Sequence, residues 1–248
     1  MTDTPHETRV LAAVVSLVDS LLDDFDVVDL LTDLTQRCAE LLDIAAAGFL
    51  LADPLQQLRL LAATSDQARE IELLQLQADE GPCLDCYATG QPVSVADVRA
   101  ETDRWPQFAI AARDAGFASV HAVPMRAAGA VLGALGLFGS RPGTLTDADL
   151  LVAQTLTHIA CVALVQQHPV TPSAVLPQLR SALASRVTIE QAKGFLREHL
   201  EIEVDQAFAI LRTYSRRRKE HLTEVAHRLV NEREFRPALL CALSELAR

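Results

Sequence analysis

The sequence predicts an α+β domain followed by an all-α domain. Over the first two thirds of the chain, stretches with apolar residues at helical spacing alternate with short apolar runs that are typical of strands. Beyond residue 168 only helical spacing remains, and three prolines within residues 169–177 separate the two patterns. We therefore expect an antiparallel sheet with flanking helices, then a bundle of three helices with a fourth helix appended.

The first elements of the sheet domain follow from periodicity and turn signals. Leucines at three- and four-residue steps predict two opening helices, and the turn signal Asp53-Pro54 lies between two predicted strands. A helix, a short strand and another helix come next. The expected ranges are helices 9–22 and 27–42, strands 45–52 and 57–63, helix 66–76, strand 91–95 and helix 105–115.

A strand pair and a closing helix complete this domain. Strands 119–125 and 130–138 are joined through a turn that ends at Gly129, and a long apolar helix covers 146–167. Thr146 and Asp149 form a carboxylate variant of the capping box at the start of that helix. We expect this domain to occupy residues 1–168, and the closing helix to pair with that of a second copy in a homodimer.

The prolines of residues 169–177 predict a short, stiff and extended linker, because proline ends a helix. Residues 178–248 then form the helical domain, with later helices at about 205–217, 221–230 and 237–246. Gly194, inside the first helix, indicates close approach by another helix or backbone. Tyr214 has the spacing of a core residue, with a stacking platform as the alternative.

The first helix of this domain is expected to bury an apolar stripe and to expose its cations. Arg186, Glu190, Lys193 and Arg197 follow one another at steps of four, three and four, opposite the stripe. Glu190 can pair with either of its two cationic neighbours. The expected stripe consists of Leu176, Leu179, Leu183, Val187, Ala192, Leu196 and Leu200.

Charge is distributed unevenly between the two domains. The chain has a net charge of −11, but residues 1–168 hold nine arginines against 23 carboxylates, a balance of −14. Residues 169–248 hold 13 cations, both lysines among them, against 10 carboxylates, a balance of +3. Such asymmetry favours contact with nucleic acid by the C-terminal domain, although a solvated charged face gives the same count.

Composition places the chain in the cytoplasm. No run of about 18 apolar residues predicts a membrane span, and the first residues lack a secretory signal pattern. The odd number of cysteines, five, fits a reducing compartment better than a disulfide framework.

The sequence carries no motif of an enzyme, and no cofactor is predicted. Cys83 and Cys86 form a C-x-x-C pair, which can be redox-active or supply half of a zinc site, but a second ligand pair is missing. No metal is therefore expected, and ordinary half-buried cysteines are favoured over a redox sensor. Trp105 and His121 are candidates for a sensor pocket, with a structural role as the simpler interpretation of each.

Several motifs of the first domain give it a resemblance to GAF domains, a sensory fold, over about residues 25–167. These motifs are E-G-P-C from Glu80, D-R-W-P from Asp103, S-V-H-A-V-P from Ser119, V-L-G-A-L-G-L-F from Val131 and L-T-D-A-D-L from Leu145. The resemblance implies a domain that senses a small molecule, whose identity the sequence does not specify.

The C-terminal domain resembles ANTAR domains, RNA-binding modules of bacterial transcription antiterminators, over about residues 174–232. The spacing of S-R-V-T-I-E-Q-A-K-G from Ser185, A-F-A-I-L-R from Ala207 and L-T-E-V-A from Leu222 carries the likeness. It implies binding of RNA with two adjacent hairpin loops, one for each protomer of a dimer, with RNA roles for Arg186 and Lys193. Local charge adds Arg197, Arg212, Arg216, Arg217, Arg218 and Lys219.

This sequence departs from the ANTAR pattern at two turns. Lys219 and Glu220 occupy the turn where Asn is common, and Glu203 stands where a Ser-type cap is usual. Two other functions stay open. The basic helices could belong to a DNA-binding helix-turn-helix regulator, or the chain could be a redox or small-molecule sensor that acts through a protein partner.

Overall fold

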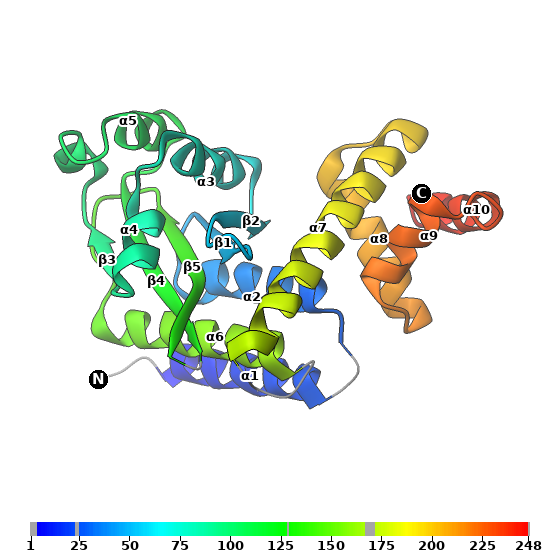
Figure 1. The fold of residues 1–248 in the computed structure, drawn as a ribbon, viewed down its shortest axis with the longest axis horizontal. Helices are drawn as coiled ribbons and strands as arrows, with labels where there is room; N and C mark the ends of the chain where they lie inside the picture. Colours follow the sequence, from blue (N-terminus) through cyan, green and yellow to red (C-terminus); the bar gives the residue numbers. More distant parts are fainter. Residues whose placement is uncertain (1–3, 23–24, 128, 167–171, 248) are drawn as a thin grey trace. The chain divides into compact units, whose positions relative to one another are not determined.

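The computed structural model describes residues 4–22, 25–127, 129–166 and 172–247 (Figure 1). The chain divides into two compact units. Unit 1 consists of Met1–Asp24 and Leu30–Arg180, and unit 2 consists of Phe25–Asp29 and Ser181–Arg248. The N-terminal sheet and the C-terminal helices that the sequence predicts thus belong to different units.

Unit 1 is built around one antiparallel sheet of five strands, in the spatial order β2-β1-β5-β4-β3. The central pairs are long: β1 is in register with β5 from Ala46 opposite Phe138 to Leu51 opposite Gly133. The five strands are β1 (Ala46–Ala52), β2 (Leu58–Ala63), β3 (Val93–Val95), β4 (Ser119–Ala127) and β5 (Ala130–Gly139). The predicted strands are confirmed.

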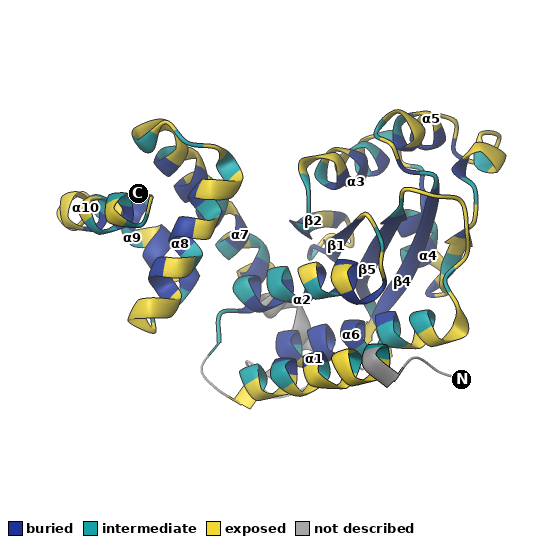
Figure 2. Ribbon diagram, turned by 180° about the vertical axis from the view of Figure 1, so that it is seen from behind, coloured by how far each residue is buried: buried dark blue, intermediate teal, exposed yellow. Residues whose placement is uncertain are grey.

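Helices cover the sheet on both faces. One layer contains α3 (Asp66–Ala78), α4 (Pro82–Thr89) and α5 (Pro106–Asp114), with the short 3-10 helix η1 (Val98–Glu101) beside α5. The opposite layer contains α6 (Asp147–Gln166), which packs on β4, and α2 (Val27–Leu41). The outermost helix, α1 (Thr4–Leu22), packs on α6 (Figures 1 and 2). The α+β class is confirmed.

Alternation along β4 assigns its side chains to the two layers. Val120 packs with Phe108 and Trp105, and Ala122 packs with Cys83, so even-numbered residues face α3, α4 and α5. Successive residues of a strand point to opposite faces, so odd-numbered residues face the α6 layer. All are buried up to Met125.

By length and composition, one helix among the described residues could cross a membrane: Asp147–Val165 in α6. In that window, 44% of the residues are buried, and the helix packs on β4. The core helix of a soluble protein passes the same test.

The sequence interpretation missed α4. Pro82 at its first position, and Gly90 with φ 65 just past its end, are the usual start and stop signals of a helix. The eight residues of α4 are too few to show periodicity, and the C-x-x-C pair drew the interpretation toward chemistry instead.

Unit 2 is helical, as predicted. It contains the part of α7 (Pro172–Leu200) from Ser181 onward, and α8 (Val204–Arg218), α9 (Leu222–Asn231) and α10 (Arg236–Leu246). The appended helix α10 packs on α8 and α9. Arg236 joins α10 to the end of α9, because its guanidinium donates to the carbonyls of Leu229 (2.8 Å) and Val230 (2.5 Å).

The expected extended linker is wrong in its second half, because α7 already begins at Pro172. Proline is tolerated in the first turn of a helix, where its missing N–H has no partner to lose. Pro172 therefore marks the beginning of this helix, whereas Pro177 lies at its sixth position, inside the helix. Residues 169–171 of the predicted linker lie outside the described residues.

Candidate nucleic-acid interface and sensor core

The face of α7 that is buried differs from the one predicted. Ala182, Arg186, Ile189, Lys193 and Leu196 are all buried, and they follow one another at steps of four and three, which places them on one side of the helix. The expectation that Arg186 and Lys193 lie opposite the apolar stripe is therefore wrong: their exposed fractions are 7% and 4%.

The error came from one position in the predicted stripe. Val187 was assigned to it but is 57% exposed, whereas Ile189 is fully buried. Ala192 and Leu196 are buried as expected, while the side chains of Leu176 and Leu179 lie outside the described residues.

One carboxylate lies between the two buried cations. Glu190 Oε1 is 2.6 Å from Arg186 Nη2 and 3.1 Å from Lys193 Nζ, so the predicted pairing occurs with both neighbours. Lys193 Nζ also lies 5.3 Å from the centre of the Phe208 ring on α8. Because a buried charge is costly unless it is paired, these contacts explain how α7 holds two cations on its buried face.

The exposed cations gather at the end of α8. Arg216, Arg217, Arg218 and Lys219 are all exposed, and Arg197 is exposed in the last turn of α7. Cations are favoured at helix C-termini, where the unpaired carbonyls carry partial negative charge. We call the four residues 216–219 the basic cluster.

Acidic residues of the segment Phe25–Asp29, which belongs to unit 2, contact α8 and α9 next to the basic cluster. Asp29 forms ion pairs with half-buried Arg212 and, at 3.3 Å, with Arg216. Asp26 accepts a hydrogen bond of 2.8 Å from the backbone N–H of Thr223 at the start of α9. The sequence analysis gave these aspartates no role.

The turn between α8 and α9 has a strained residue. Lys219 has φ 55, in the left-handed region that glycine and asparagine adopt more readily. The backbone N–H of Glu220 donates to Ser215 O at 3.0 Å and closes the turn. The departure from the ANTAR pattern at this turn therefore costs stability without opening the loop.

Two further expectations for these helices had different outcomes. Tyr214 is buried, with an exposed fraction of 9%, as expected for a core aromatic. The expected close approach at Gly194 is wrong, because a Cβ built there would meet, beyond its own stretch of helix, no heavy atom of the described residues within 4 Å. At the start of α8, Gln206 accepts a hydrogen bond of 3.3 Å from the backbone N–H of Glu203.

A buried polar cluster lies in the core of unit 1, between α3, α4 and the sheet. Gln75 Nε2 donates to Glu72 Oε2 at 2.5 Å, and the backbone N–H of Cys83 donates to Gln75 Oε1 at 3.1 Å. Cys83 Sγ lies 3.8 Å from Glu72 Oε1. Burial raises the pKa of Glu72 to about 8, so the carboxyl is predominantly protonated at neutral pH.

Glycines on the two central strands leave room for this cluster. A Cβ built at Gly48 would lie 2.6 Å from Glu72 Oε1, and one at Gly136 would lie 2.3 Å from the same atom. The side chain of Glu72 thus fills space that larger residues on β1 and β5 would occupy. Two polar residues, Glu72 and Gln75, on the same helix face as Ala68 and Ile71 were the signal for this cluster, and the sequence interpretation did not use it.

Cys83 and Cys86 lie in the first turns of α4 and are both fully buried. Burial raises the pKa of the Cys83 thiol well above its usual range, with a further contribution from Glu72, and raises the pKa of Cys86 to about 12. Reactive cysteines have a lowered pKa and some exposure, so this environment favours inert thiols. No group of three potential metal ligands occurs among the residues that the structure describes.

Trp105 and His121 do not share a pocket. Trp105 packs with Val120 in the layer of α3 and α5, whereas His121, the next residue of β4, faces the opposite layer. The ring of Trp105 lies 4.2 Å from the guanidinium carbon of Arg104. His121 Nδ1 is 2.7 Å from Ser94 Oγ, and burial lowers the pKa of the imidazole. Both residues have the features of core residues.

Comparison with known proteins gives a match in each part of the chain. The GAF domain family matches residues 26–165, and the ANTAR domain family matches residues 177–230. No curated protein sequence matches the chain.

Two solved structures illustrate the fold. The first is the GAF domain from Acinetobacter phosphoenolpyruvate-protein phosphotransferase, with 15% identity, a TM-score of 0.50, and 66% of this chain and 93% of that chain covered. The second is free methionine-R-sulfoxide reductase from Neisseria meningitidis in complex with its substrate, with 17% identity, a TM-score of 0.50, and coverages of 73% and 96%. At such identities the likeness shows the fold alone.

Proposed function

Because the chain belongs to the GAF domain family and continues into an ANTAR domain, we propose that it is a cytoplasmic transcription antiterminator whose unit 2 recognises RNA with two adjacent hairpins. The sensor domain controls this recognition. GAF and ANTAR domains are sensor and regulatory RNA-binding modules, and the proposal gives this chain no catalytic step of its own.

The observation that carries the proposal is the basic cluster at the end of α8, in the part of the chain with a net positive charge. Sequence-specific RNA recognition mostly reads unpaired loop bases, which arginine contacts by stacking and by hydrogen bonds. Residues 216–219 and Arg197 are exposed and suit such contacts, and half-buried Arg212 borders them.

Arg186 and Lys193 remain in the proposal with a changed role. Both are buried and paired to Glu190, so they act first by fixing α7 against α8. Direct contact with RNA requires an RNA phosphate to replace Glu190 as their anion, with both side chains turning outward. We therefore place the first contacts of RNA at the basic cluster.

Two hairpins in one RNA call for two copies of the binding domain. We propose that the chain is a homodimer in which each copy holds one loop, and that a small molecule or a redox event in the GAF domain changes how available the binding surface is. Such a signal acts only if it favours one conformation of the protein over another. Trp105, His121, Cys83 and Cys86 stay as proposed sensor residues, although the burial of all four favours structural roles.

A competition experiment separates this function from that of a DNA-binding regulator. Full-length protein bound to labelled RNA with two hairpins is challenged with unlabelled RNA of the same sequence, or with duplex DNA of equal charge, at one stated salt concentration. The proposal predicts that only the RNA competes efficiently. Efficient competition by duplex DNA would replace the proposal with major-groove binding by a helix-turn-helix.

A further inference from the structure

The segment Phe25–Asp29, which contains the start of α2 and belongs to unit 2, places two carboxylates on α8 and α9. Asp29 uses both of its carboxylate oxygens on α8: Oδ1 accepts a hydrogen bond from Arg212 Nε, and Oδ2 lies 3.3 Å from Arg216 Nη2. The side chains of Asp29 and Arg212 are only 18% and 19% exposed. This ion pair is therefore partly shielded from water and from salt, unlike an ordinary surface pair.

Asp26 caps two helices at once. Its Oδ1 accepts hydrogen bonds from the backbone N–H groups of Val28 (2.9 Å) and Asp29 (3.0 Å) in the first turn of α2. Its Oδ2 accepts hydrogen bonds from the backbone N–H (2.8 Å) and the hydroxyl (2.5 Å) of Thr223 in the first turn of α9. The N-cap residue of α9, His221, makes no side-chain capping hydrogen bond. The anion at the start of α9 is thus supplied by a residue that lies 197 positions before Thr223.

The donors that hold these aspartates also suit phosphate. Arginine binds carboxylate and phosphate groups with the same planar array of N–H donors, and the N-terminus of a helix favours either anion. We call Arg212, Arg216 and Thr223 the anion site. Arg216 also belongs to the basic cluster, so the anion site continues the surface on which the proposed function places the first RNA contacts. The chain's own carboxylates therefore occupy a position that suits an RNA phosphate.

We propose that the anion site binds backbone phosphates of RNA, and that Asp26 and Asp29 are internal competitors that occupy it in the protein without RNA. This inference rests on the RNA recognition in the proposed function, and it adds a contact site and the groups that block it. Because the segment is part of the same chain, it competes at a high effective concentration, and RNA has to displace it. Release of Phe25–Asp29 is then a step that a signal can favour, since a ligand acts by binding one of two conformations more tightly.

Asparagine substitutions separate competition from a purely structural role. Asn has nearly the shape of Asp and caps helices equally well, so Asp26→Asn keeps the cap of α2. Asp29→Asn likewise keeps the shape of its side chain, and together the two changes remove both anions from the anion site. If the aspartates only join the segment to α8 and α9, the variant is less stable and binds RNA no better. If they compete with phosphate, the variant binds RNA more tightly, which an unfolded variant cannot do.

The test is the affinity of the full-length protein for an RNA with two adjacent hairpins, measured by filter binding at one salt concentration. We expect Asp26→Asn with Asp29→Asn to lower the dissociation constant about tenfold or more. A tenfold change corresponds to a segment that covers the anion site about nine-tenths of the time, because only the uncovered fraction of the protein binds at its full affinity.

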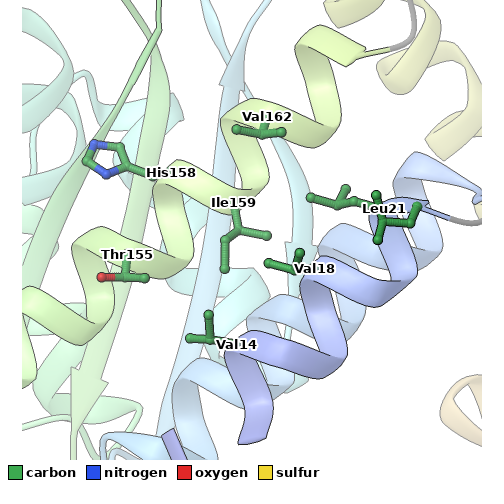
Figure 3. Close-up of a pocket in the computed structure, with 8 residues that line it drawn as sticks. Val14, Val18, Leu21, Thr155, His158, Ile159 and Val162 are labelled. Carbon is green, nitrogen blue, oxygen red and sulfur yellow. The ribbon is translucent and has the colours of Figure 1, made fainter. Parts of the chain in front are cut away.

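The control variant removes the same charge from unit 1. It is Asp19→Asn with Glu70→Gln, both at exposed positions. Asp19 lies on α1, where Val18 and Leu21 border an apolar groove of about 320 Å³ that α1 shares with α6 (Figure 3). Among the described residues, no arginine or lysine lines that groove, so the control uncovers no site for phosphate there. Its dissociation constant should stay within about twofold of that of the wild type, because salt screens distant charges.

A further substitution links the gain in affinity to the anion site. In the wild type Arg212 is paired with Asp29, so Arg212→Gln should change the RNA affinity by less than about threefold. In the variant with both Asn substitutions Arg212 is no longer paired with Asp29, and Arg212→Gln should cancel most of the gain. Such non-additivity is expected of groups that share one site.

Equal or weaker RNA binding by the Asp26→Asn, Asp29→Asn variant would overturn the inference and leave RNA recognition standing. An equal gain in the control variant would also overturn it, because total charge would then explain the effect. A gain that is the same for RNA with altered loop bases would support the anion site and contradict recognition of the loops. If neither the wild type nor the variant binds RNA, both the anion site and the proposed function are contradicted.

Discussion

Arg186 and Lys193, one helical turn to either side of Glu190, share the same carboxylate oxygen: Glu190 Oε1 lies 2.6 Å from Arg186 Nη2 and 3.1 Å from Lys193 Nζ. Both cations are buried on the face of α7 that also carries Ile189. The two residues that the ANTAR resemblance assigns to RNA thus have an internal anion. Their first effect is on the stability of unit 2.

Replacing Glu190 tests this shared carboxylate. Glu190→Gln removes the carboxylate that the two buried cations share, so we expect it to lower the free energy of unfolding by about 1–3 kcal/mol. Thermal unfolding followed by circular dichroism measures the loss. Glu198→Gln removes the same charge from an exposed position of α7 and is the control. Equal melting temperatures for the two variants would show that the carboxylate does not hold the cations.

Neutralising the basic cluster tests RNA contact without disturbing the core. Arg217 and Arg218 are both exposed, so Arg217→Ala with Arg218→Ala should change stability by less than about 0.5 kcal/mol. Loss of two phosphate contacts should weaken RNA binding about 10- to 100-fold and make the slope of log K against log salt less steep by about 1.4. Filter binding over a salt series gives both numbers.

The control for the double variant is Arg99→Ala, which removes an exposed arginine from unit 1. It should leave both the affinity and the salt slope unchanged. If it weakened RNA binding as much as the double variant does, binding would depend on total charge, and the basic cluster would have no special part in it.

The turn after α8 offers a stabilising substitution. Lys219 has φ 55, and glycine adopts this conformation without the cost that a Cβ brings, so Lys219→Gly should stabilise the protein by about 0.5–1 kcal/mol. The same change one position earlier, Arg218→Gly, falls inside α8 and should destabilise it. Urea unfolding curves of the two variants should shift in opposite directions. Shifts in the same direction would refute the strain argument.

Glu72 predicts how stability depends on pH. Its pKa is about 8 in the folded protein against 4.5 as its ordinary value, so between these values the folded state binds the proton that the unfolded state has released. The contribution of Glu72 to the free energy of unfolding is therefore fully present below about pH 4.5 and is lost as pH rises through about 8. Glu72→Gln cannot ionise and should remove this fall.

The measurement is the free energy of unfolding at pH 6 and pH 9 for the wild type and for Glu72→Gln. The free energy of unfolding of the wild type minus that of Glu72→Gln should change by an amount on the order of 2 kcal/mol between pH 6 and pH 9. Glu70→Gln, on the same helix but at an exposed position, should keep the pH dependence of the wild type. Parallel curves for wild type and Glu72→Gln would place the titration elsewhere.

Cysteine accessibility tests the inert-thiol interpretation. Cys38, Cys83, Cys86 and Cys161 are buried and Cys241 is exposed, so a thiol reagent should label one cysteine quickly in the native protein. The fast phase should disappear in Cys241→Ser and return in full on denaturation. Fast labelling of Cys83 or Cys86 in Cys241→Ser would instead favour the redox sensor that acts through a partner.

Most of the fold could be predicted from the sequence, because apolar residues recur at regular spacing along most of its helices and strands. Helices α8 and α9 were predicted to within one residue at each end, and the strand pair β4–β5 to within two. Short elements without periodicity were harder to find. Helix α4 has eight residues, and proline in its first turn was not recognised as a helix start.

The chemistry of the candidate site was less accessible from the sequence because it depends on which face of a helix is buried. A shift by two positions, from Val187 to Ile189, turns Arg186 and Lys193 from exposed to buried. The contact of Asp29 with Arg212 joins residues 183 positions apart, and no local pattern encodes it. The cluster around Glu72 likewise depends on the pairing of β1 with β5, which brings Gly48 opposite Gly136.

The measurement that tests the central claim most directly is the affinity of the full-length protein for an RNA with two adjacent hairpins, compared with the same RNA carrying altered loop bases. Both are measured at one salt concentration near physiological. The account predicts a loss of at least about 2 kcal/mol when the loop bases change, because stacking on each unpaired base contributes about 1–3 kcal/mol. Equal affinity for both RNAs would show attraction to phosphate alone and contradict recognition of the loops.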